Sequence, residues 1–95
     1  MMRLTAYISG RIQRVGYRAK IVDLARKMGL AGLVQNRPDG QVLVIAEGEK
    51  EDLEEFAAAL QIKNTFIEVL GISLEYSPGS GGLSNRLIRV MRLLS

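Results

Sequence analysis

The chain has 95 residues, of which 47% are hydrophobic and 24% charged, with a formal net charge of +3, and this balance indicates a single globular domain over residues 1–95. It contains neither cysteine nor histidine, which excludes disulfides, a thiolate nucleophile, a histidine-based triad and the commonest zinc ligands. No apolar run is long enough to span a membrane and no signal peptide is recognisable, so we expect a cytoplasmic protein with no membrane partner.

The first half of the chain carries strand and helix patterns in turn. Residues 4–8, LTAYI, alternate apolar and polar side chains as a half-buried strand does, and residues 17–28 have apolar side chains at the spacing of one helix face. Residues 31–36, AGLVQN, and residues 41–47, QVLVIAE, have the composition of strands. Between them, RPDG at residues 37–40 is typical of a tight turn, so this region is predicted to be a hairpin.

The second half repeats this order. Acidic side chains after residue 48 favour the start of a second helix, because carboxylates stabilise the positive end of a helix dipole. Residues 67–76 predict a fourth strand, SPGSGG at residues 77–82 breaks regular structure, and residues 85–92 predict a last, cationic strand. Strand, helix, strand, strand, helix, strand is the βαββαβ order of the α+β, ferredoxin-like sandwich, an antiparallel sheet with two helices on one face.

Charge is distributed unevenly along the chain. Residues 1–46 carry eight basic and two acidic side chains, residues 47–76 carry two basic and eight acidic, and residues 77–95 carry three basic and none acidic. The basic first half suits an anionic ligand, although solvated faces of opposite sign would explain the same division.

The segment GRIQRVGYR, residues 10–18, joins the first predicted strand to the first predicted helix and contains three arginines and two glycines. Backbone amides at a helix N-terminus have no partner within the helix, and those of a glycine-containing loop can converge on phosphate oxygens. Arg18 adds a planar guanidinium that can bind two such oxygens at once. The residues therefore predict an anion site, against the simpler interpretation of a surface loop with solvated arginines.

Two motifs occur together in this half of the chain. The first consists of Gly10, Gln13, Val15, Gly16, Tyr17 and Arg18. The second is GLAGLVQNRPDGQV, followed by AEG. They closely resemble the GxVQGVGxR-like loop and the GxVxNxxDGxV-like hairpin of the acylphosphatase family, at the expected distance from each other. Two long motifs in register are far more specific than an isolated glycine pattern.

The resemblance implies an enzyme that hydrolyses small acyl phosphates to a carboxylate and inorganic phosphate, with no metal and no other cofactor. It assigns the phosphoryl group to the Arg18 side chain and to the backbone amides of Gln13, Arg14, Val15, Gly16, Tyr17 and Arg18. It assigns the attacking water to the side chain of Asn36, which spacing alone would make a turn residue bonded to its own backbone. Because a carboxylate is a good leaving group, positioning and charge stabilisation can carry this reaction without histidine or cysteine.

Two features leave other interpretations open. The family loop usually has glycine where this chain has Arg14, and a residue with a Cβ is strained there if φ is positive. An acylphosphatase-like module with an anion pocket but little activity is therefore one alternative. The other is a nucleic-acid-binding module, which the basic first half suggests but the absence of aromatic residues from residues 41–47 disfavours. We expect a monomer or weak homodimer, and we expect Tyr17 to pack with its hydroxyl at the surface.

Overall fold

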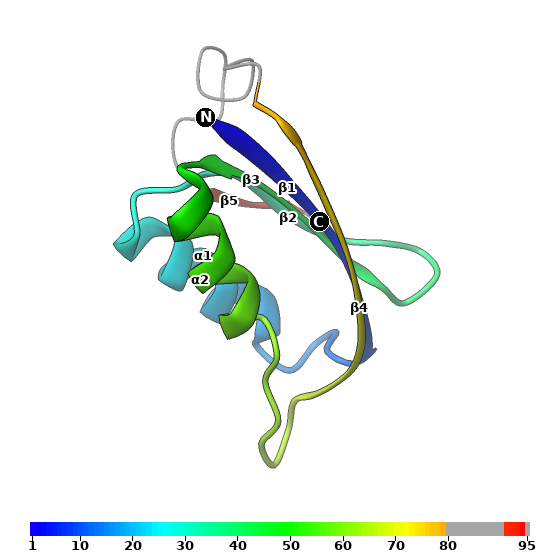
Figure 1. Ribbon diagram of the computed structural model, residues 1–95. Coiled ribbons are helices and arrows are strands. Elements are labelled where there is room, and N and C mark those ends of the chain that lie inside the picture. Colours follow the sequence, from blue (N-terminus) through cyan, green and yellow to red (C-terminus); the bar gives the residue numbers. More distant parts are fainter. Residues whose placement is uncertain (80–90, 95) are drawn as a thin grey trace.

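The computed structural model describes residues 1–79 and 91–94, and in it two helices cover one face of a five-stranded sheet (Figure 1). The elements are β1 (Met2–Arg11), α1 (Tyr17–Lys27), β2 (Ala31–Asn36), β3 (Val42–Gly48), α2 (Lys50–Ala59), β4 (Glu68–Pro78) and β5 (Met91–Leu94). The strand order is β4-β1-β3-β2-β5, with β5 parallel to β2 and every other neighbouring pair antiparallel. The predicted α+β, ferredoxin-like βαββαβ fold is thus confirmed, and β5 extends it at one edge.

Several elements are longer or shorter than the sequence predicted. β1 runs from Met2 to Arg11 because it lies inside the sheet and pairs with both β3 and β4. β4 continues to Pro78, so the first two residues of the predicted breaker belong to a strand. Residues 80–82 of that breaker and most of the predicted strand at residues 85–92 lie outside the described residues. No helix within the described ranges is long and apolar enough to cross a membrane.

The register of the sheet decides which side chains face the helices. β1 and β3 contribute six side chains with no exposed surface to this face, namely Leu4, Ala6, Ile8, Val42, Val44 and Ala46. Val42 is paired with Ile8 on one side and with Asn36 on the other. Because directly opposed residues of neighbouring strands share a face, Asn36 belongs to the helix-covered side of the sheet.

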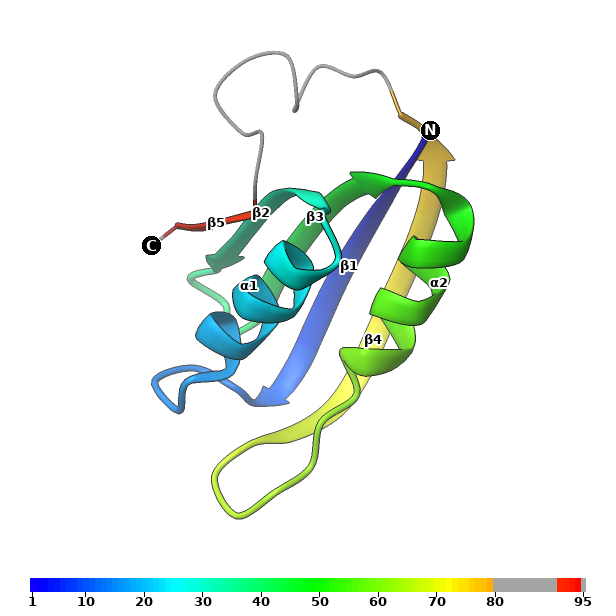
Figure 2. The same ribbon diagram turned by 90° about the vertical axis from the view of Figure 1, so that its left-hand side faces the viewer.

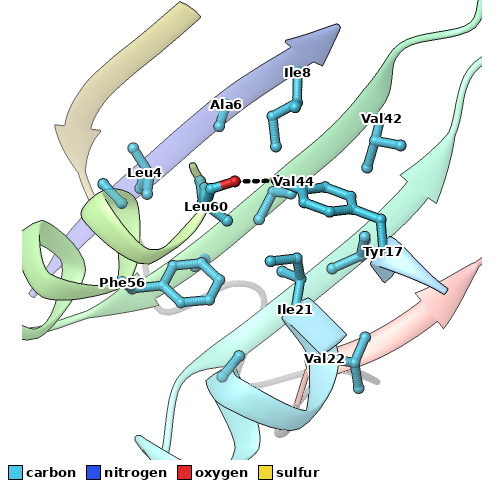
Figure 3. Close-up of a cluster of buried hydrophobic side chains, with 14 of the residues drawn as sticks. Leu4, Ala6, Ile8, Tyr17, Ile21, Val22, Val42, Val44, Phe56 and Leu60 are labelled. Carbon is cyan, nitrogen blue, oxygen red and sulfur yellow. Dashed lines mark hydrogen bonds between the residues drawn. The ribbon is translucent and has the colours of Figure 1, made fainter. Parts of the chain in front are cut away.

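Each helix packs one apolar side against this face. The buried residues of α1 are Tyr17, Ile21, Val22 and Ala25, and those of α2 are Leu53, Phe56 and Ala57. These positions repeat every three or four residues, which places them on one side of each helix. The polar side of each helix remains toward solvent, and the core lies between the helices and the sheet (Figures 2 and 3).

Tyr17 joins the two helices through its hydroxyl. The side chain has no exposed surface, and its hydroxyl donates a hydrogen bond of 2.7 Å to the carbonyl oxygen of Leu60, the residue that ends α2 (Figure 3). The prediction of a surface hydroxyl is therefore wrong, because helical spacing does not show that the end of α2 lies over the start of α1. Burial raises the pKa of the Tyr17 hydroxyl.

We expect Tyr17→Phe to lower the free energy of unfolding by about 1–2 kcal/mol, because the buried carbonyl of Leu60 loses its donor. The folded-state pKa of Tyr17 is above that of the unfolded chain, so stability is fully present below about pH 10 and falls as the pH rises further. Urea denaturation at pH 7 and pH 11 measures both effects. The control is Tyr7→Phe, since Tyr7 is exposed. Equal stabilities of the two variants would contradict the role given to the Tyr17 hydroxyl.

Candidate active site

A β-bulge ends the regular pairing of β1 and releases the chain into the loop of residues 12–16. The register with β4 shifts between Ser9 and Gly10, and Gly10 has a φ of 136°. A Cβ at Gly10 would collide with the backbone carbonyl of Glu68. Glycine is therefore required at this bulge, because the backbone of β4 comes too close to β1 to leave room for a Cβ.

The start of α1 presents the positive end of a helix to this loop. Gly16 caps the helix with a φ of 85°, and the first intrahelical bond runs from the Lys20 amide to the Gly16 carbonyl at 3.2 Å. The amides that precede Lys20 in the first turn have no carbonyl partner within the helix. The first turn of α1 also contains no acidic residue, whereas that of α2 contains Glu51 and Asp52. The N-terminus of α1 therefore favours a bound anion.

A hollow of about 120 Å³ lies where the loop meets α1. Its walls are formed by Ile12, Arg14, Gly16, Tyr17, Arg18 and Ala19. Arg18 is half-buried and Arg14 is exposed, and none of the six described wall residues is acidic. The hollow therefore combines two guanidinium-bearing residues with a helix N-terminus, which is an electrostatic environment for an anion.

The structure brings four of the six predicted phosphate-binding residues to the hollow, namely Arg14, Gly16, Tyr17 and Arg18. The other two do not line it: the half-buried Val15 packs against the hydrophobic core, and the Gln13 side chain bonds elsewhere. Sequence reasoning missed Ile12 and Ala19, which also line the hollow. Each directly adjoins a predicted residue in the chain, and this proximity is the only signal that could have identified them.

Gln13 connects the loop to the β2–β3 hairpin. Its side-chain amide donates hydrogen bonds of 3.1 Å to the carbonyls of Arg37 and Gln41, which are the first and last residues of the turn between the strands. The Arg37 amide in turn donates to the Gln41 carbonyl at 2.8 Å, which closes the hairpin. Figure 2 shows the loop and the hairpin at the same end of the sheet. Since Arg37 directly follows Asn36, Gln13 fixes the loop beside the end of β2.

Asn36 is the last residue of β2 and is half-buried. Its Oδ1 is buried and accepts no hydrogen bond from the described part of the chain. The side-chain bond that shapes the adjacent turn comes instead from Asp39, whose Oδ1 accepts from the Gln41 amide at 2.9 Å. Because buried acceptors are almost always bonded, the Asn36 oxygen is suited to a donor supplied by water or a ligand rather than to a turn.

Arg14 has a φ of 65° and is the one residue other than glycine with a positive φ among residues 1–79 and 91–94. The condition for strain that the sequence raised is therefore met at this position. A left-handed conformation costs a residue with a Cβ about 1–2 kcal/mol. Gly16, two residues later, adopts a similar conformation without that cost.

We expect Arg14→Gly to exceed Arg14→Ala in free energy of unfolding by about 0.5–1 kcal/mol. Both variants remove the guanidinium, but only glycine relieves the left-handed strain, and this relief outweighs the entropy that glycine loses on folding. Gly16→Ala is the converse control, because it introduces a Cβ at a left-handed position. That Cβ would have no atom within 4 Å, so only backbone strain would change. It should lower stability by a similar amount. A Gly variant of Arg14 no more stable than the Ala variant in urea denaturation would contradict this account.

No three histidine, cysteine, aspartate or glutamate side chains of the described ranges group closely enough to hold a metal ion. The polar groups that line the hollow include the guanidinium groups of Arg14 and Arg18 and backbone N–H groups. These groups bind oxyanions and stabilise negative charge as it develops on them.

Comparison with known proteins decides the family. The acylphosphatase family profile matches residues 4–84. The chain belongs to the acylphosphatase family. The acylphosphatase of Thermus thermophilus is 41% identical over 81 residues, which cover 85% of this chain and 92% of that protein, and the acylphosphatase of Deinococcus radiodurans is 40% identical over 80 residues, which cover 84% and 92%.

The fold agrees with this assignment. A crystal structure of acylphosphatase from Bacillus subtilis superposes with a TM-score of 0.89 at 32% identity, and the match covers 100% of both chains. The prediction of an acylphosphatase enzyme is thus confirmed and is favoured over an anion- or nucleic-acid-binding module.

Proposed function

We propose that this acylphosphatase hydrolyses small acyl phosphates to a carboxylate and inorganic phosphate, with the phosphoryl group bound in the hollow by Arg18 and the loop amides and the attacking water oriented by Asn36. The observation that carries the proposal is the composition of the hollow. It places the half-buried Arg18 beside a helix N-terminus whose first turn has no carboxylate to offset the dipole.

Arg18 and the backbone amides act on the charge of the phosphoryl group. The guanidinium offers a planar pair of donors to two oxygens, and the amides at the start of α1 offer further donors fixed by the backbone. In the transition state, negative charge is spread over the phosphoryl oxygens, and donors already in place stabilise it without reorganisation. These interactions therefore raise kcat as well as affinity, because they strengthen as the reaction proceeds.

Asn36 acts on the water. Its Oδ1 accepts a hydrogen bond from the water and so directs a lone pair at phosphorus, but a neutral amide does not remove the proton. The phosphorus–oxygen bond to the acyl group breaks as the new bond forms, and the proton of the water passes to a phosphoryl oxygen or to solvent. The departing carboxylate needs no proton at neutral pH, since carboxyl groups ionise near pH 4. No general acid is then required.

The remaining features of the proposal follow from the sequence. We propose that residues 1–95 form one domain that works in the cytoplasm as a monomer or weak homodimer, with no metal and no organic cofactor. The absence of histidine and cysteine and the uncharged amide at Asn36 support a mechanism based on positioning and charge stabilisation.

Two variants separate the proposed roles. In benzoyl phosphate hydrolysis with a chelator present, we expect Arg18→Ala to lower kcat/KM by about 10³-fold or more and to abolish phosphate binding, because it removes the half-buried cation. Asn36→Ala should lower kcat by about 10²-fold with little change in KM, because the orientation of water matters in the transition state. Arg26→Ala, an exposed site in the last turn of α1, is the control.

The same assay can contradict either role. An Arg18→Ala enzyme with a near-native rate would remove that residue from the mechanism. If Asn36→Ala weakened phosphate binding as much as it slowed turnover, Asn36 would bind the phosphoryl group rather than the water. Arg18→Lys keeps the charge but not the planar fork, and should recover only part of the loss.

Gln13→Ala should lower kcat/KM by about tenfold, because the loop is no longer tied to the hairpin and a small displacement of positioned groups slows the reaction. The matched control is Gln61→Ala, which also removes a glutamine whose side-chain amide bonds a backbone carbonyl, that of Val69 at 3.0 Å, and which does not line the hollow. Urea denaturation measures the stability of both variants. Loss of activity in proportion to stability in both would show that Gln13 has no particular role at the site.

A further inference from the structure

The two arginines of the hollow differ in their surroundings. Arg18 lies in the first turn of α1 and is half-buried, whereas Arg14 lies in the loop and is exposed. No hydrogen bond or ion pair is found between the Arg14 side chain and the described residues. The proposed function uses the guanidinium of Arg18 and only the backbone of Arg14, so it leaves one cationic side chain without a role.

The size of the hollow indicates which part of the substrate fits inside it and which part stays outside, near Arg14. At about 120 Å³ it is far smaller than the pockets of about 300–1,000 Å³ that enclose a drug-sized ligand. It therefore accepts the phosphoryl group and leaves the acyl group at its mouth. Of the two arginines that line the hollow, the exposed Arg14 is then the one available to the acyl group, and the half-buried Arg18 the one available to the phosphoryl group.

None of the residues that line the hollow is acidic, and none of the ion pairs found among the described residues includes Arg14. Residues 1–46 contain two acidic side chains, and both lie beside other cations. The Asp23 carboxylate is 3.0 Å from the Lys27 ammonium, and the Asp39 carboxylate is 4.0 Å from the Arg37 guanidinium. The field of Arg14 is therefore available to a ligand at the mouth of the hollow.

The backbone of Arg14 gives an independent reason to assign it a function. Arg14 has a φ of 65°, a conformation that glycine would adopt without strain. Strained conformations cost about 1–3 kcal/mol each and occur preferentially where a ligand is bound. The arginine at this position therefore lowers stability and places a cation on the wall of the hollow.

We infer that Arg14 makes this enzyme selective for acyl phosphates whose acyl group carries a second negative charge, such as a carboxylate. The inference rests on the proposed function, because it assumes that Arg18 holds the phosphoryl group. Arg14 is then a specificity-determining residue that attracts the acyl end of the substrate, while the reaction at phosphorus is unchanged.

The test compares benzoyl phosphate with 4-carboxybenzoyl phosphate, which differ by one carboxylate remote from the reacting bond. The quantity measured is the ratio of kcat/KM for the two substrates in the unmodified enzyme, Arg14→Ala, Arg14→Lys and Lys20→Ala. Taking this ratio between variants cancels the difference in leaving group. Lys20 is the matched control, because it is an exposed cation of α1 that does not line the hollow.

We expect Arg14→Ala to lower the preference for the carboxylated substrate by about three- to fivefold, the effect of a solvent-exposed charge pair. Arg14→Lys and Lys20→Ala should keep the preference, and 1 M salt should remove most of it by screening. An equal ratio in the unmodified enzyme and Arg14→Ala would overturn the inference, as would an equal loss of preference in Lys20→Ala.

The outcomes distinguish this inference from the function on which it rests. If the unmodified enzyme hydrolyses neither substrate, the proposed function fails, and the inference fails with it. If it hydrolyses both and the ratio does not depend on Arg14, the function stands and the inference alone is wrong. If Arg14→Ala slows both substrates equally, Arg14 binds the phosphoryl group instead and the inference is again wrong.

Discussion

Two hydrogen bonds from the side-chain amide of Gln13 hold the loop of residues 12–16 against the β2–β3 hairpin. Gln13 bonds carbonyls that are 24 and 28 residues away in the sequence, at the base of a hairpin whose strands lie inside the sheet. The loop thereby acquires the fixed position of the β2–β3 ladder without forming a strand itself. Electrostatic stabilisation depends on donors that are already in place. If the substrate had to order the donors first, part of its binding free energy would be used for that ordering.

The distribution of charge over the two helices complements this geometry. Both helices lie on the same face of the sheet, yet the carboxylates are in the first turn of α2 and absent from that of α1. Carboxylates in the first turn of α1 would stabilise the helix but would also neutralise the end that faces the hollow. The positive end of the helix dipole is therefore neutralised by carboxylates in α2, which stabilises that helix, and is left available to an anion in α1.

Local patterns were sufficient to predict most of the fold. Apolar spacing predicts the first strand and the first helix, because burial on one side of an element imposes a period on the sequence, and composition, turn residues and charge predict the second helix and the next three strands. The two motifs also predict Arg18 and Asn36 as site residues, and their catalytic roles stay predictions. In contrast, the interior position of β1, and so its full length, follows from pairing with strands that are distant in sequence.

The contacts at the site that the sequence does not predict also join residues that are distant along the chain. The Gln13 side chain finds its partners across the sheet, and the Tyr17 hydroxyl finds its partner at the end of the other helix. Neither contact has a periodic signature along the chain. The sequence indicates that strain at Arg14 depends on its φ but does not give that angle, because arginine by itself gives no indication of a left-handed backbone.

The hydrogen bond from Tyr17 has a consequence for how this protein varies during evolution. Tyr17 is part of the core and also lines the hollow, and its neighbour Arg18 lines the hollow as well, so one helical turn serves both folding and the site. A substitution that loosens the turn reduces folding and chemistry at once, and a less stable chain is also removed faster by cellular proteases. Substitutions that loosen this turn are therefore expected to lower the activity of each molecule and the number of folded molecules together.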